Sequence, residues 1–354
     1  MNSQATQWNE QYSLERERLL QALGKVGGGG IVESIQHVGS TSVPDLYGSP
    51  CVDIGMAIWP FPLETGSASK LAALGYHPVT GYEGEPEQRF LHESQAYQLF
   101  LMESGSDRWT NMALLRDYLR DDPAARADLS LRKREGGGDH SQLIESLLPA
   151  AQRWWISQYQ FSPVEAVAHE LKDAALLWYI SGGWALDLFL GRVSRVHHDV
   201  DVIVARSAQM DLQRHMTRRG WTLLTPFESR REPWPPHMHL ELPRHQVHAL
   251  RGDDFIDFLL TDMNHVWVYR REPSVVRSLE KMGLSTEGGI PYLAPELVLL
   301  FKSKNTSNRE RLNDEADFER ALPRLDSERR AWLRWALIAT DPQHPWIPKL
   351  SSFT

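Results

Sequence analysis

The chain has 354 residues, of which 42% are hydrophobic and 24% are charged, and its formal net charge is −8. This length and composition indicate two globular domains of ordinary size and exclude an intrinsically disordered chain. No apolar run reaches the roughly eighteen residues of a membrane span, and the first 25 residues lack the apolar run of a signal peptide. We therefore expect a cytoplasmic protein that does not bind membranes.

The single cysteine, Cys51, excludes an intrachain disulfide and a multi-cysteine zinc site, and we interpret it as a small buried apolar residue. The acidic balance argues against nucleic acid as a partner bound by charge, and it favours neutral or cationic partners.

The first half of the chain predicts helices alternating with short strands. Apolar residues at helical spacing predict helices over residues 7–25, 110–120 and 141–159. Apolar runs predict strands over residues 31–38, 52–58 and 97–102. The glycine run 27–30 ends the first helix, and polar residues with a proline after residue 159 mark a domain boundary at residue 160.

The second half follows the same local plan of strand, glycine turn and helix. Two expected helices end near residues 174 and 190, a third covers 208–219, and the chain is expected to be helical from 295 to 340. Strands are expected over 176–180 and 200–204, followed by a strand-rich region over 221–269. Both halves place a glycine turn before an acidic strand, which suggests two tandem related domains over residues 1–160 and 161–354.

Two aspartates of the second half, Asp199 and Asp201, are the first candidates for chemistry. Alternate residues of a strand point to the same face, about 6.6 to 6.8 Å apart, so both carboxylates can converge while Val200 and Val202 face the core. Aspartate is depleted in strands, and a hard cation such as Mg²⁺ would explain two carboxylates on one face. The alternative is a strand edge that carries two solvated acids.

A third aspartate, Asp257, lies inside the apolar run 254–260, and a neighbouring strand could present it to the same metal. Paired metals can clamp the attacking and leaving oxygens of a displacement, and a carboxylate beside them can accept the proton of the nucleophile. Asp257 is therefore our candidate base, although by itself it could equally be an isolated buried acid.

The glycine pair Gly182 and Gly183 forms a turn before an expected helix. Glycine lets the backbone approach a ligand closely, and the first turn of a helix offers free N–H groups to phosphate oxygens. Ser181 precedes the pair and could add a hydroxyl contact. Most glycine pairs are only turns, but this one lies shortly before the two aspartates.

Four basic residues of the second half could bind triphosphate oxygens, and surface charge is the alternative for each: Arg192, Arg195, Lys302 and Lys304. His197 could contact the site or could cap the strand entry.

Two further groups in the second half admit two interpretations. A histidine-rich segment could be a metal site or, because of its prolines, a surface hairpin: His237, His239, Glu241, His245 and His248. Four acids of the last third are interpreted as a solvated helix face or an acidic rim for a cationic acceptor: Asp314, Glu315, Asp317 and Glu319.

The second half resembles the aminoglycoside 2''-adenylyltransferase group of the nucleotidyltransferase superfamily, a group of antibiotic resistance enzymes. The motifs are Gly-Gly-Trp-Ala-Leu-Asp at 182–187 and Arg-x-His-x-Asp-x-Asp at 195–201, with likeness continuing over 267–271, 289–296, 299–302 and 314–318. The resemblance implies ATP as substrate, Mg²⁺ as cofactor, transfer of a nucleoside monophosphate to a hydroxyl, and release of pyrophosphate. By position it gives Asp199, Asp201 and Asp257 the metal-ligand roles.

The first half resembles the GrpB family of the same superfamily, on the motifs at residues 37–46, 50–54 and 115–120. In the superfamily plan Asp53 would be the first metal carboxylate, but Gly55 holds the next position on that face. No third acid lies in the expected strand 97–102. We therefore expect a catalytically degenerate domain that keeps a nucleotide- or phosphate-binding turn at Gly39 and Ser40.

Together these features predict an α+β chain of two tandem nucleotidyltransferase-fold domains, each a mixed sheet flanked by helices, with a helical C-terminal extension on the second. The function expected first is Mg²⁺-dependent transfer of AMP from ATP to a hydroxyl of a small, aminoglycoside-like acceptor. Two alternatives stay open, namely transfer to a protein or RNA acceptor, as in toxin-type relatives, and a nucleotide-binding module without turnover.

Overall fold

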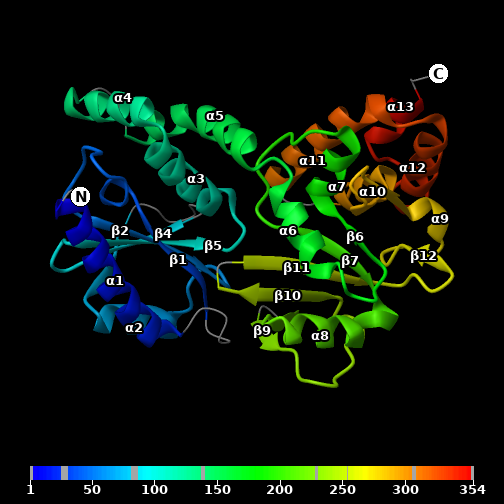
Figure 1. Ribbon diagram of the computed structural model, residues 1–354, viewed down its shortest axis with the longest axis horizontal. Helices are drawn as coiled ribbons and strands as arrows, with labels where there is room; N and C mark the ends of the chain where they lie inside the picture. Colours follow the sequence, from blue (N-terminus) through cyan, green and yellow to red (C-terminus); the bar gives the residue numbers. More distant parts are fainter. Residues whose placement is uncertain are drawn as a thin grey trace. The chain divides into compact units, whose positions relative to one another are not determined.

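The computed structural model describes residues 3–24, 31–80, 87–136, 140–227, 230–252, 254–304 and 308–351. The chain divides into two compact units, which Figure 1 traces from blue to red. The first comprises residues 1–158 with 226–233 and 251–253, and the second comprises residues 159–225, 234–250 and 254–354. The boundary at residue 160 and the functional contrast between the two domains stay predictions.

The first unit is built on a mixed sheet whose described strands are β1 (Val32–Val38), β2 (Val52–Ile58), β3 (Tyr76–Pro78), β4 (Glu87–His92) and β5 (Tyr97–Glu103). Their order in the sheet is β1-β2-β5-β4-β3. β2 pairs antiparallel with β1 and parallel with β5, while β4 pairs antiparallel with β5 and with β3.

Helices cover both faces of this sheet: α1 (Ser3–Leu23), α2 (Thr65–Ala73), α3 (Asp107–Asp121), α4 (Pro123–Arg134) and α5 (His140–Tyr159). Figure 1 shows α1 and α2 on one face and α3 on the other. Ile54 and Met56 of β2 lie in the core cluster that α1 and α2 cover. Because strand side chains alternate, Asp53 is turned to the face that α3 covers.

The second sheet contains the strands β6 (Trp178–Ile180), β7 (Asp201–Ala205), β8 (Thr222–Phe227), β9 (Arg230–Pro233), β10 (Gln246–Arg251), β11 (Asp254–Thr261), β14 (Gly283–Ser285) and β15 (Pro291–Leu293). Their order is β14-β15-β6-β7-β11-β10-β8-β9. β7 pairs antiparallel with β6 and parallel with β11. A separate pair is formed by β12 (Val266–Val268) and β13 (Val276–Ser278).

The two sheets share one topology. The segment β6-β7-β11-β10-β8 repeats the order β1-β2-β5-β4-β3, with an antiparallel pair followed by a parallel strand in each. A helix also connects β2 to β3 and β7 to β8. This repetition supports the interpretation of the halves as tandem related domains.

The helices of the second unit are α6 (Ser162–Leu171), α7 (Gly182–Leu190), α8 (Gln209–Arg218), α9 (Leu279–Met282), α10 (Pro295–Lys302), α11 (Asn308–Ala321), α12 (Ser327–Thr340) and α13 (Trp346–Ser351). The last four form the predicted C-terminal extension. Its core includes Phe318, whose ring stacks on Trp346 with centroids 4.2 Å apart.

The structure confirms the predicted α+β class with a mixed sheet and flanking helices in each half. The predicted strand 52–58 coincides with β2. β7 begins at Asp201, so Asp199 lies in the segment just before the strand and not within it. The helices α2 and α4 were not predicted, because neither carries a long apolar stripe. The glycine run 27–30 lies outside the described residues.

Among the described residues, no helix is long and apolar enough to cross a membrane.

The C-terminal extension gives a stability prediction. Phe318 of α11 is fully buried, whereas Leu312 of the same helix is 73% exposed. We expect Phe318→Ala to lower the free energy of unfolding by about 3–5 kcal/mol, because it removes a packed ring and leaves a cavity. Leu312→Ala is the matched control, and urea unfolding of the full chain is the measurement. Equal effects of the two substitutions would contradict this packing.

Candidate active site

The parallel pairing of β7 with β11 brings the three predicted aspartates together. Asp201 and Asp257 are direct partners in the register of the two strands. Paired residues of neighbouring strands lie side by side on one face, about 4.8 Å apart. Asp199 precedes β7 by two positions, and each of the three residues offers a carboxylate oxygen within 4.8 Å of the other two. The predicted convergence is therefore present in the fold.

Burial raises the pKa of Asp199 and of Asp201, and at Asp201 the repulsion by neighbouring carboxylates adds to this effect. Burial, followed by the charges of Asp199 and Asp257, raises the pKa of Asp201 well above its ordinary value. Burial also raises the pKa of Asp199, against the opposing effects of His198 and Arg195. A divalent cation among the oxygens would relieve this repulsion, and carboxylate oxygens are ligands that Mg²⁺ accepts. The donor set thus fits the predicted metal.

Within the described ranges, this triad is the one group of three or more histidine, cysteine, aspartate or glutamate side chains that could hold a metal ion. The alternative metal site at His237, His239 and Glu241 therefore has no support.

The glycine turn at the start of α7 lies directly against Asp201. Gly182 has a φ of 60°, and a Cβ at this position would collide with Oδ2 of Asp201. A Cβ on Gly183 would collide with the ring of His197. Ser181 is buried, and its N–H donates to the carbonyl oxygen of Asp201 over 2.8 Å. Only glycine permits this approach, so the pair has a steric role beside the carboxylates.

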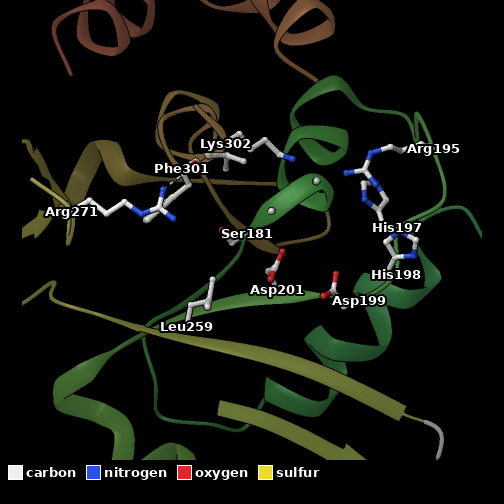
Figure 2. Close-up of a pocket in the computed structure, with 13 residues that line it drawn as sticks. Ser181, Arg195, His197, His198, Asp199, Asp201, Leu259, Arg271, Phe301 and Lys302 are labelled. Carbon is white, nitrogen blue, oxygen red and sulfur yellow. Dashed lines mark hydrogen bonds between the residues drawn. The ribbon is translucent and has the colours of Figure 1, made fainter. Parts of the chain in front are cut away.

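A pocket of about 270 Å³ opens beside the turn and the strand end. Ser181, Gly182 and Gly183 line it together with Asp199 and Asp201. Three cations also line it, namely Arg195, Arg271 and Lys302, and its apolar wall consists of Leu259, Val298 and Phe301. Figure 2 shows the carboxylates of Asp199 and Asp201 pointing into this space, with Arg195 and Arg271 at opposite ends.

Buried acids hold two of these cations in place. Lys302 Nζ lies 2.5 Å from Oδ1 of Asp314 and 2.9 Å from Oδ2 of Asp317. Although burial opposes it, the charges of Asp317 and Asp314 raise the pKa of Lys302 above its ordinary value. Arg195 also contacts Asp317, over 3.4 Å. Lys302 and Arg195 therefore reach the pocket as fixed positive charges.

This arrangement corrects the interpretation of the acids on α11. Asp314 and Asp317 are both 3% exposed, so they are buried partners of cations and not a solvated face or acidic rim. Glu315 and Glu319 pair with Lys349.

The segment between α7 and β7 is held by a buried histidine and aspartate. His197 Nε2 lies 2.7 Å from Oδ2 of Asp187, which also accepts from the N–H of Ser194. Burial lowers the pKa of His197 to about 4, so the ring is neutral near pH 7. The ring of Trp184 packs on His197 with centroids 4.4 Å apart and a tilt of 34°, and its N–H donates to the carbonyl oxygen of Asp199 over 2.9 Å. His197 and Trp184 thus position Asp199.

Asp257 lies deeper than the other two carboxylates. It is buried and does not line the pocket. Gln246 of β10 donates to Oδ2 of Asp257 over 2.5 Å, and His248 Nε2 lies 3.8 Å from Oδ1. These two contacts fix the orientation of the carboxylate. The sequence analysis missed this role of Gln246, because the pairing of β10 with β11 has no local signature.

Two predicted phosphate contacts need correction. Arg192 is exposed and does not line the pocket, because it follows the C-terminal end of α7 while the pocket lies at the N-terminal end. Lys304 is also outside the pocket, and its Nζ donates to the carbonyl oxygen of Thr340. Arg195 and Arg271 are the arginines that reach the site.

The first unit repeats the glycine contact but not the carboxylates. Gly39 has a φ of 69°, and a Cβ there would collide with Oδ2 of Asp53, as one on Gly182 would with Asp201. Asp53 pairs with Gln98 in the parallel register of β2 and β5, where Asp201 pairs with Asp257. Asp53 is therefore the counterpart of the second carboxylate and not, as expected, of the first.

The remaining counterparts follow from this register. Cys51 takes the position of Asp199, and Gln98 takes that of Asp257. Burial raises the pKa of Asp53 to about 7, and burial with the charge of Asp53 raises the pKa of Cys51 to about 11. One carboxylate, one thiol and one amide make a poor site for Mg²⁺.

Two glycines, one at the start of α7 and one just after its end, allow a matched test of the turn. Gly182 and Gly191 both have positive φ, but a Cβ on Gly191 meets no atom within 4 Å. We expect each substitution by alanine to cost about 1–2 kcal/mol of stability through backbone strain. Only Gly182→Ala should weaken Mn²⁺ binding, by about tenfold or more, because it displaces Asp201. Unchanged Mn²⁺ affinity in a folded Gly182→Ala protein would rule out this role of the turn.

Comparison with known proteins separates the two halves. Residues 1–155 match the family model of the GrpB protein, and residues 163–284 match that of aminoglycoside-2''-adenylyltransferase. The chain is 24% identical to the UPF0157 protein YqkA of Bacillus subtilis over 42% of its own length. It is 33% identical to the UPF0157 protein SCO7215 of Streptomyces coelicolor over 34% of its length. The matched part of the chain spans 42% of the length of YqkA and 60% of the length of SCO7215.

Among solved structures, that of the antibiotic-resistance factor ANT(2'')-Ia is similar to this chain. The alignment covers 50% of this chain and 88% of the ANT(2'')-Ia chain, with 18% sequence identity and a TM-score of 0.32. The two family models confirm both resemblances seen in the sequence. The chain therefore combines a GrpB-type domain over residues 1–155 with an aminoglycoside-2''-adenylyltransferase-type domain that matches over residues 163–284.

Proposed function

We propose that the second unit transfers AMP from ATP to a hydroxyl of a small molecule, with Mg²⁺, and releases pyrophosphate. The observation that carries this proposal is the convergence of Asp199, Asp201 and Asp257 within 4.8 Å, beside a glycine turn and a pocket. The family match over residues 163–284 supports nucleotidyl transfer as the class of reaction.

The pocket offers the groups that a triphosphate needs. Arg195, Lys302 and Arg271 line it and supply positive charge to phosphate oxygens. Gly182 and Gly183 of the first turn of α7 line the same pocket, and the N-terminal end of a helix favours anions. Because Asp314 and Asp317 already fix Lys302, the side chain of Lys302 loses little conformational entropy when the phosphates bind.

Asp199 and Asp201 would hold the Mg²⁺, with Asp257 as a third ligand. When bound, the metal would neutralise charge on the reacting phosphate and help align the displacement. Asp257 is in addition our candidate for the base that accepts the proton of the acceptor hydroxyl. Its contact with Gln246 supports this role, because a fixed carboxylate needs no reorientation.

The acceptor proposed first is an aminoglycoside-like compound, because the matching family is named for that activity. The apolar wall of Leu259, Val298 and Phe301 suits the ring of a small molecule. Asp314 and Asp317 of α11 are buried, so these two acids offer no charge to a cationic acceptor and do not favour aminoglycosides over other hydroxyl compounds. Transfer to a protein or RNA, and nucleotide binding without turnover, are the competing proposals.

The test is transfer from α-labelled ATP by the full chain, with Mg²⁺ and panels of aminoglycosides and lincosamides. We expect pyrophosphate release together with a labelled small molecule. Asp257→Asn should lower the rate about 10²–10⁴-fold, because the variant lacks the base. The matched control is Asp262→Asn, since Asp262 follows β11 directly and is 57% exposed. Labelling of a protein or RNA instead, or an equal loss in both variants, would contradict the proposal.

A further inference from the structure

The first unit has a pocket at the place where the second unit has its candidate active site. This pocket measures about 430 Å³. Ser40, which follows Gly39 as Gly183 follows Gly182, lines it. Ser49 and Pro50 line it as well, and they precede Cys51 as His197 and His198 precede Asp199. The two pockets thus share three lining positions, although Gly39, Cys51, Asp53 and Gln98 lie beside this pocket and do not line it.

A divalent cation has little to hold it at this place. The positions of the triad carry Cys51, Asp53 and Gln98, and the raised pKa values of the first two leave at most one charge near pH 7. No metal-binding group of three acidic, histidine or cysteine residues exists here among the residues that the structure describes. A phosphorylated ligand would need its counter-charge from protein side chains instead.

Such counter-charge is present on the last turn of α4. Arg134 lines the pocket, and Lys133 acts electrostatically on Asp53. Ser40 and Ser49 add hydroxyl groups to the lining, which contains one acid, the exposed Asp45. Guanidinium and hydroxyl groups are common donors to phosphate oxygens.

The wall of the pocket also offers aromatic rings. Trp8 and Tyr47 both line it, and Tyr47 is 47% exposed, so its ring is accessible to a ligand. The guanidinium of Arg134 lies over the ring of Tyr47, with 5.1 Å from Cζ to the centroid. A stacking surface next to a guanidinium is the pairing that a base and its phosphates require.

We propose that the first unit holds a second ligand site, which binds a nucleotide-like phosphorylated compound without a divalent cation. Arg134 contacts the phosphates, Ser40 and Ser49 donate to them, and Tyr47 with Trp8 stacks on the ring. The site is for binding and not for transfer, because its metal ligands are replaced. This inference does not rest on nucleotidyl transfer by the second unit.

The first test is calorimetric titration of the full chain with ATP in excess EDTA. We expect saturable binding that Arg134→Ala weakens about tenfold or more, because a charge-assisted contact is lost. Arg132→Ala is the matched control, since Arg132 lies on the same helix but does not line the pocket. ATP should also bind about tenfold more tightly than tripolyphosphate, which has no ring.

Three results would overturn the proposal. These are no binding of ATP in EDTA, unchanged binding in Arg134→Ala, and equal affinity for ATP and tripolyphosphate. The readout is binding alone, so a failure here is distinct from a failure of the transfer assay.

The second test restores the missing ligands. In an Asp201→Asn background, which removes one carboxylate of the other site, Cys51→Asp together with Gln98→Asp should create a new Mn²⁺ site. We expect a gain of at least tenfold in Mn²⁺ affinity, measured by electron paramagnetic resonance. A double variant that keeps the parental circular dichroism and unfolding temperature, yet gains no Mn²⁺ affinity, would refute the equivalence of the two sites.

Discussion

The pairing of β7 with β11 is the interaction on which the second unit depends. It places Asp201 directly beside Asp257, while Asp199 approaches from the segment before the strand. Three carboxylates at this distance repel one another, and burial together with that repulsion raises the pKa of Asp201. A fold tolerates such a cluster when a function requires it. The rest of the site either brings the carboxylates together or balances their charge.

Charge alternates outward from the triad. Lys302 and Arg195 line the same pocket as the carboxylates of Asp199 and Asp201. Each of these cations is in turn paired with a buried acid, since Asp317 contacts both and Asp314 contacts Lys302. Removal of one member of a buried ion pair is costly, because its partner stays charged and buried. The helix α11 is therefore part of the site, although none of its described side chains lines the pocket.

The sequence could predict what depends on local spacing. Asp199 and Asp201 lie two positions apart, and the glycine pair lies one short helix earlier, so both were identified from the residues themselves. The position of Asp257 depends on strand register, which no local pattern encodes, and its prediction relied on the family resemblance. The burial of Asp314 and Asp317 could not be predicted, because a helix with five acids has the composition of a solvated one. Asp53 was aligned with the wrong carboxylate because its partner, Gln98, is not an acid.

We expect a divalent metal to bind at the triad of the second unit and not at its counterpart in the first. Iron-mediated cleavage is the test, because Fe²⁺ bound in a Mg²⁺ site and supplied with hydrogen peroxide and ascorbate generates hydroxyl radicals that cut the nearby backbone. We predict cuts in the full chain near Gly182, Asp201 and Asp257, and we expect excess Mg²⁺ to suppress these cuts. Cuts near Gly39, Asp53 and Gln98 of equal strength, or no specific cuts at all, would contradict it.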